Sequence, residues 1–189
     1  NKKFILQYFT NEKGLFVKKP SSKLIIASFL INLANQLKSK NNIPTSYTKM
    51  LLEISNFVYP ELKFSNFYLS DIYENEGNSQ IAINKLSTIK QNSLVFVPAL
   101  IKKYRTTKTL DPKKSKLYLK EMKENHFSHI SVKYELANNL RLNNKCAESI
   151  NIFNQILKEM PKNTQFLFYK ASCLEKLGRW NEAKNIFYK

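Results

Sequence analysis

The sequence is poor in turn-forming residues: its 189 residues include only three glycines and six prolines. A turn-rich β-fold uses both types often, so this shortage argues against one. Gly14, Gly77 and Gly178 are far apart, and each stands at a predicted turn. A phosphate-binding loop needs several closely spaced glycines, and the chain therefore contains no such loop.

Cysteine and histidine are equally scarce, with two residues of each. We interpret Cys146 and Cys173 as small packing residues, because two cysteines form no disulfide framework in a chain of this length. His126 and His129 lie three residues apart, but no cysteine or carboxylate at ligand spacing completes a zinc site. We therefore predict no metal, no cofactor, no catalytic residue and no enzyme activity. The cysteine content fits a reducing compartment and also allows the cell envelope, so cytoplasmic and periplasmic locations both stay open.

The sequence has no apolar run long enough for a membrane span. The longest stretch covers the 11 residues 24–34 and contains two polar side chains, whereas a span needs about 20 apolar residues. Lysines precede it, as in a signal peptide, but no small-x-small cleavage site follows. We predict instead a buried helix that ends near Lys38, with Ser21 and Ser22 as caps. Its apolar stripe consists of Leu24, Phe29, Leu33 and Leu37.

Arginine is nearly absent although the chain is strongly basic. The net charge is +17, and the basic residues are 28 lysines against three arginines, alongside 22 asparagines. A basic surface attracts nucleic acid, but arginine is the residue suited to bidentate phosphate and base contacts. Lysine and asparagine are also enriched by an AT-biased genome. The composition thus favours a solvated lysine-rich surface or a site for an acidic partner over nucleic-acid binding.

A regular repetition is present instead. Five small residues each stand four places before a Leu or Phe, and successive pairs are 34, 33, 34 and 34 residues apart. A period near 34 is that of a helix–turn–helix unit that cannot bury its own apolar face and must stack on a neighbour. The five pairs are Thr48/Leu52, Ala82/Leu86, Ser115/Leu119, Ser149/Phe153 and Ala183/Phe187. We call these pairs the rungs, and they predict an all-α array.

Helix starts and stops divide the array into units. Pro44 begins a helix whose stripe continues through Met50, Leu51, Ile54 and Val58, while Gly77 closes a later helix. Residues 1–20 are interpreted as the tail of a preceding helix and a connecting arm. The predicted array covers 21–189, with approximate units 21–62, 63–95, 96–129, 130–163 and a truncated 164–189.

The last two units align at an offset of 34 residues. Tyr134 matches Phe168, Ala137 matches Ala171, and Asn144 matches Gly178, where Asn is the usual substitute at a positive φ. This pattern resembles the tetratricopeptide repeat (TPR), and the best match lies in 164–189, at Leu167, Ala171, Leu174, Gly178, Trp180, Ala183 and Phe187. Lys133 and Lys170 depart from the pattern, and 96–129 fits only in its second helix.

The resemblance implies a right-handed superhelical solenoid of antiparallel helix pairs with about 4.5–5 repeats, as a section of a longer bacterial multi-repeat protein. It also implies a concave groove lined by the first helix of each unit, where aromatic anchors beside polar groups suit peptide recognition. The candidate groove residues are Phe64, Phe67, Asp71, Tyr134, Asn138, Arg141, Phe168, Ser172 and Glu175.

Two readings of these residues stay open, since Tyr134 and Phe168 could instead pack between repeats. Asn138 resembles one member of the carboxylate clamp of chaperone-binding relatives, but Tyr134 replaces the neighbouring lysine, which argues against a chaperone-tail receptor. The expected function is a non-catalytic scaffold that binds a peptide or partner protein, acidic in one interpretation. The alternatives are a substrate-recruiting region of a larger glycosyltransferase or protease with its catalytic domain outside this chain, and an RNA-binding helical repeat.

Overall fold

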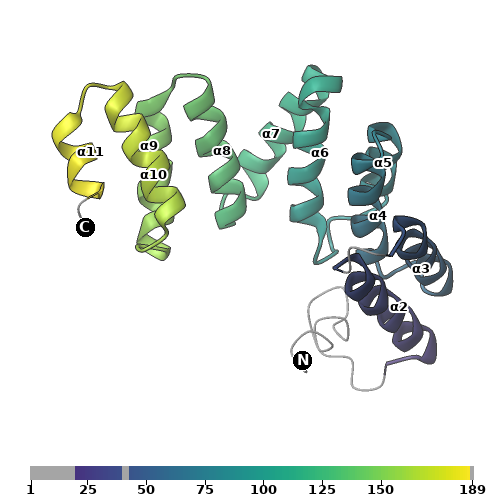
Figure 1. The fold of residues 1–189 in the computed structure, drawn as a ribbon. Helices are drawn as coiled ribbons and strands as arrows, with labels where there is room; N and C mark the ends of the chain where they lie inside the picture. The colour runs from purple at the N-terminus through teal and green to yellow at the C-terminus, as the bar shows by residue number, and fades with distance from the viewer. Residues whose placement is uncertain (1–19, 40–42, 188–189) are drawn as a thin grey trace. The chain divides into compact units, whose positions relative to one another are not determined.

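The computed structural model describes residues 20–39 and 43–187, apart from the side chain of Phe187, and Figure 1 shows the helices. Within these residues ten helices follow one another and no strand occurs. The prediction of an all-α helical repeat is confirmed. The helices are α2 (Ser22–Lys38), α3 (Thr45–Val58), α4 (Phe64–Asn75), α5 (Ser79–Ser87), α6 (Phe96–Leu110), α7 (Pro112–Asn125), α8 (Ile130–Leu142), α9 (Cys146–Glu159), α10 (Thr164–Lys176) and α11 (Trp180–Phe187).

The chain divides into two compact units, which are described separately below. Unit 1 ends at Ser115 and unit 2 begins at Lys116. In unit 1, α2 packs on α3, α3 on α4, and α4 on α5; in unit 2, α8 packs on α9, α9 on α10, and α10 on α11. The predicted tail and arm at 1–20 lie outside the described residues, except for Pro20. No helix in the described part of the chain combines the length and the apolar character that a membrane crossing requires.

Three equivalent turns join the helices of a pair by the same backbone device. Gly77, Asn144 and Gly178 have φ angles of 79°, 59° and 72°. In each turn the next residue donates its backbone N–H to a carbonyl five residues earlier, as in Lys145 to Leu140 at 2.9 Å. This left-handed cap satisfies the last carbonyls of the first helix. The prediction that Asn144 takes the role of Gly178 is therefore confirmed.

The small residues of the rungs lie where adjacent helices come close. Thr48, Ala82, Ser115, Ser149 and Ala183 are all buried. Three of their larger partners are fully buried, namely Leu52 on α3, Leu86 on α5 and Phe153 on α9. A fourth, Leu119, is half-buried. A small side chain permits close approach and the larger one fills the remaining space, which is how an array of this kind replaces one central core.

The apolar stripes predicted for the first two helices are correct only in part: Leu24 is buried, and Leu51 and Val58 pack against the same core. Phe29 is 63% exposed, and Met50 and Ile54 are also exposed. The buried surface of α2 instead includes Ala27, Ser28 and Ala34 beside Leu24 and Ile31, and that of α3 consists of Thr48, Leu52 and Ser55. Closely packed helices also select small side chains for the contact, so counting hydrophobic residues alone included some positions that lie outside it.

Both cysteines are buried in unit 2, as predicted for packing residues. Cys146 on α9 and Cys173 on α10 belong to one cluster with Ile150, Ala171 and Leu174. Burial, with a smaller effect of the neighbouring Cys146, raises the pKa of the Cys173 thiol from its ordinary value of 9.0 to about 11. The thiol therefore stays protonated and unreactive near neutral pH.

Phe153 provides a direct test of the rung assignment. Its side chain is fully buried, with its ring 6.4 Å from that of Phe166 and 6.0 Å from that of Tyr169. We expect Phe153→Ala to lower the free energy of unfolding by about 3–5 kcal/mol, because it leaves a cavity between helices. Urea unfolding followed by circular dichroism measures this. The matched control is Phe168→Ala, an exposed Phe on α10, which should change stability by less than about 1 kcal/mol; equal losses would contradict the assignment.

Candidate functional site

The nine predicted groove residues fall into two separate groups. Phe64, Phe67 and Asp71 lie on α4 in unit 1, and the other six lie on α8 and α10 in unit 2. Each group follows a helical spacing of three or four residues, which places its members along one side of a helix. The six residues of unit 2 are Tyr134, Asn138 and Arg141 on α8, and Phe168, Ser172 and Glu175 on α10.

The group on α4 is engaged within the chain. Asp71 forms ion pairs with Lys102 of α6 and with Lys38 of α2, the latter at 3.9 Å. Lys102 is largely buried, with its side chain 12% exposed, and it also contacts Glu74 at 3.3 Å. The same ammonium lies 5.9 Å from the Phe67 ring centroid. The Asp71 carboxylate therefore joins three successive first helices of unit 1.

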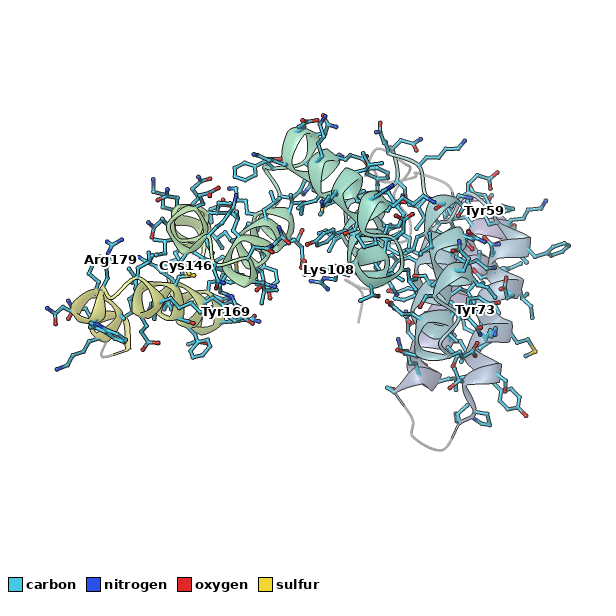
Figure 2. The ribbon with its side chains drawn as sticks, turned by 90° about the horizontal axis from the view of Figure 1, so that it is seen from above. Tyr59, Tyr73, Lys108, Cys146, Tyr169 and Arg179 are labelled. Atoms are coloured by element: carbon cyan, nitrogen blue, oxygen red, sulfur yellow. The ribbon has the colours of Figure 1, made fainter. Side chains whose placement is uncertain are left out.

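A second network in unit 1 surrounds Tyr73, which Figure 2 labels. Glu53 of α3 accepts from Lys85 of α5 at 2.7 and 3.0 Å, and from the Tyr73 hydroxyl at 3.3 Å. Lys49 lies 4.2 Å from the Tyr73 ring centroid and donates to Glu76 at 3.0 Å. This hydrogen bond, against a smaller opposing effect of burial, raises the pKa of Lys49. Lysine and carboxylate side chains thus join α3, α4 and α5.

The sequence analysis missed these ion pairs, although a signal was present. Asp71 and Lys102 are 31 residues apart, and Glu53 and Lys85 are 32 apart. Both separations are close to the period of 33–34 residues between rungs. Opposite charges spaced by nearly one repeat lie on neighbouring helical repeats, so their pairing could have been proposed from the sequence.

Arg141 is held by contacts with two other residues of unit 2. Its Nε and Nη2 atoms donate to Asn138 Oδ1 at 3.2 and 2.8 Å. Its guanidinium carbon lies 4.7 Å from the ring centroid of Tyr169 on α10, a distance at which a cation is attracted to a ring. Both Asn138 and Arg141 are half-buried. The side chain is therefore held in place by α8 and α10 together.

Tyr169 is the residue of this site that sequence reasoning missed, because the alignment selected its neighbour Phe168. The Tyr169 ring lies 6.1 Å from that of Tyr134 in a stacked arrangement, and Tyr134 also lies 5.6 Å from Phe166. Tyr134 thus packs against the core of unit 2, as one of the two interpretations of this residue expected. Figure 2 labels Tyr169 within this part of the chain.

The hydroxyl of Tyr169 is electrostatically perturbed. Gln165 Nε2 donates to it at 3.2 Å, and a donated hydrogen bond stabilises the phenolate. This bond is the main cause of a lowered Tyr169 pKa, followed by the Tyr134 side chain and, against the effect of burial, the charge of Arg141. Tyr134 and Arg141 therefore both act on the Tyr169 hydroxyl.

The remaining residues on α10 lie toward solvent. Phe168 is 56% exposed, with its edge toward the Tyr169 ring at a centroid distance of 5.9 Å. Ser172 is half-buried and Glu175 is exposed. The contacts therefore run from Asn138 through Arg141 and Tyr169 to Phe168, and we call these four residues the α8–α10 site. Among the described residues no group of three His, Cys, Asp or Glu side chains could hold a metal ion.

Comparison with known proteins identifies the fold. No protein-family model matches the sequence. No curated protein matches it either. Twenty-two chains of solved structures match the fold. One of them is described as "Crystal structure of MamA protein": it has a TM-score of 0.57 and 14% sequence identity, and the match covers 86% of this chain and 88% of that one. At this identity the likeness shows the fold alone, which is a TPR-like helical repeat.

Asp71 is expected to act in stability. Asp71→Asn should lower the free energy of unfolding by about 1–2 kcal/mol, because the nearly buried Lys102 loses a charged partner. Urea unfolding followed by circular dichroism measures this. In the control, Glu124→Gln, the lost pair with Lys120 is exposed and 3.9 Å long, so the change should stay below about 0.5 kcal/mol. An unchanged stability in Asp71→Asn would assign Asp71 to binding instead.

The coupling at Tyr169 predicts an order of pKa changes. Gln165→Ala should raise the pKa of Tyr169 most, and Arg141→Ala should raise it less, because each change removes a group that favours the phenolate. Titration of tyrosine ¹³Cζ resonances by NMR measures both values, and Tyr169→Phe identifies the resonance. A wild-type value at or above the ordinary 10.0 would show that the hydrogen bond is not formed.

Proposed function

We propose that the chain is a non-catalytic protein-interaction scaffold that binds an acidic peptide at the α8–α10 site. The TPR-like fold supports protein binding in general. The observation that carries the specific proposal is the fixed position of Arg141 between Asn138 and Tyr169, whose ring the exposed Phe168 also contacts. A positioned cation beside an exposed aromatic ring is a pattern of peptide-binding surfaces.

The hydrogen bonds of Arg141 leave capacity for a ligand. A guanidinium has five N–H donors, and the bonds to Asn138 use one hydrogen on Nε and one on Nη2. The remaining donors can bind a carboxylate in the bidentate geometry that arginine favours. Because Tyr169 and Asn138 already hold the Arg141 side chain in place, this side chain would lose little conformational entropy when a ligand binds.

Phe168 supplies the second contact of the proposed site. Its ring is exposed and forms a T-shaped contact with Tyr169, so its outer surface can bury an apolar side chain of a peptide. Arg141 and Phe168 both contact Tyr169, which supports a site that combines a cationic and an apolar contact. The expected ligand is therefore a peptide with an acidic residue adjacent to a large apolar one.

The proposal is tested with peptides selected from a random peptide library displayed on phage. Selection on the wild-type chain should enrich sequences with an Asp or Glu beside a large apolar residue. Asn138→Ala with Arg141→Ala should weaken their binding at least about tenfold, as removing a charged hydrogen-bond partner does. Fluorescence anisotropy measures the Kd, and the Tm should stay nearly unchanged because both residues are half-buried and at the surface.

Two controls make this result specific. Asn154→Ala with Gln155→Ala changes two exposed polar residues of α9 and should leave the Kd unchanged. Arg141→Lys keeps the charge and loses the bidentate geometry, so it should recover only part of the affinity. Selected peptides without acidic residues, or unfolding of the Asn138→Ala/Arg141→Ala variant, would refute the assignment of this site.

A further inference from the structure

Helix α7 carries a row of exposed lysines that takes no part in packing. Within unit 2, Lys116, Lys120 and Lys123 are spaced at i, i+4 and i+7, which places them on one face of the helix. All three are exposed, and the Lys120 side chain is 69% exposed. Leu117 follows Lys116 directly, so it lies beside this row of lysines rather than within it, and it is 63% exposed. We call Lys116, Leu117, Lys120 and Lys123 the lysine ridge.

The ridge differs from the lysines that stabilise the fold. Lys85, Lys102 and Lys133 reach carboxylates on neighbouring helices at 2.7–3.3 Å, and their side chains are largely buried. Lys120 instead has a contact of 3.9 Å with Glu124 on its own helix, where both side chains are more than half exposed. Such a pair contributes little to stability.

Placing the ridge lysines together has a cost for the isolated helix. Lys116 and Lys120 are four residues apart, and like charges at this spacing destabilise a helix slightly. The α7 sequence contains five lysines and only two glutamates. Repulsion of this kind is relieved when a partner brings opposite charge to the same face.

The chemistry of the ridge distinguishes between classes of acidic partner. Single-stranded nucleic acid is bound by exposed aromatic rings and arginines, but α7 contains no arginine, and its one aromatic residue, Tyr118, is half-buried. Helices that lie in a membrane surface expose a broad apolar face, whereas the ridge has the single residue Leu117. An exposed leucine beside a row of lysines matches an acidic amphipathic helix, which presents carboxylates next to an apolar stripe.

We propose that the lysine ridge binds an acidic amphipathic helix of a partner protein. At a rise of 1.5 Å per residue the three lysines span about 10 Å, or two helical turns. A helix aligned with α7 presents carboxylates at i, i+4 and i+7 over the same length, and an apolar residue beside them can contact Leu117. This surface is separate from the α8–α10 site and goes beyond the function proposed above.

The probe is a fluorescein-labelled, alanine-based helical peptide with glutamates at i, i+4 and i+7 and one leucine among them. Its binding is followed by anisotropy at physiological salt, beside a peptide of the same composition with the order scrambled. The ridge variant combines Lys116→Glu, Lys120→Glu and Lys123→Glu and should bind the helical peptide at least about tenfold more weakly. The matched control combines Lys90→Glu, Lys158→Glu and Lys162→Glu, three exposed lysines elsewhere, and should lose less than about threefold.

Each outcome decides the proposal. Equal binding of the scrambled peptide, an equal loss in the matched control, or no binding of the helical peptide would refute it. Tighter binding of a single-stranded RNA or of phosphatidylserine vesicles, lost in the ridge variant, would assign the ridge to another class of partner. If the charge-reversed variant does not fold by circular dichroism, the three Lys→Gln changes replace it. Asn138→Ala with Arg141→Ala should leave ridge binding unchanged, so failure here is separable from failure at the α8–α10 site.

Discussion

Close contact between helices across small side chains is the constraint on which the rest of this structure depends. Ser149 Oγ on α9 donates to the carbonyl of Ala137 on α8 at 2.8 Å, and both residues are fully buried. Ser115 makes the equivalent contact with the Tyr104 carbonyl at 3.5 Å. A larger residue at these positions would separate the helices. Bulky apolar side chains such as Phe29 therefore lie on the outside, which creates surfaces as well as a core.

The two units meet this constraint with different side-chain chemistry. Unit 1 joins its helices through lysine–carboxylate pairs, with Asp71 contacted from both neighbouring first helices. Unit 2 also contains the Lys133–Glu159 pair and adds aromatic rings packed around Tyr169. Ion pairs weaken as salt concentration rises, while packed aromatic rings are much less sensitive. The surfaces offered to a partner differ accordingly. On α4 the Asp71 carboxylate is already paired with lysines, and on α8 the Arg141 guanidinium is held in a fixed position.

The sequence was sufficient to predict features that depend on a single helix pair. The rungs and the positive φ of Asn144 follow from spacing and residue type, because each acts within one helix pair. The stripes of α2 and α3 were predicted only in part, because the pattern counted hydrophobic residues and ignored their size. To predict the contacts of Tyr169 and the ion pairs of Asp71 and Glu53, one must know how neighbouring helical repeats are aligned. Short turns fix this alignment in the structure, and the spacing pattern in the sequence does not specify it. For Asn138 and Arg141 the sequence indicated the helix face, and the structure added their mutual hydrogen bonds.

Trp180 has a consequence for spectroscopy. It is the one tryptophan of the chain, and at the start of α11 its indole is 65% exposed. Emission from a solvated indole is red-shifted in the native state and changes little when the rest of the chain unfolds. Intrinsic fluorescence of this protein is therefore a local signal of α11 and a poor measure of global folding. The same property makes the indole a background-free reporter for any molecule that covers the outer side of that last helix.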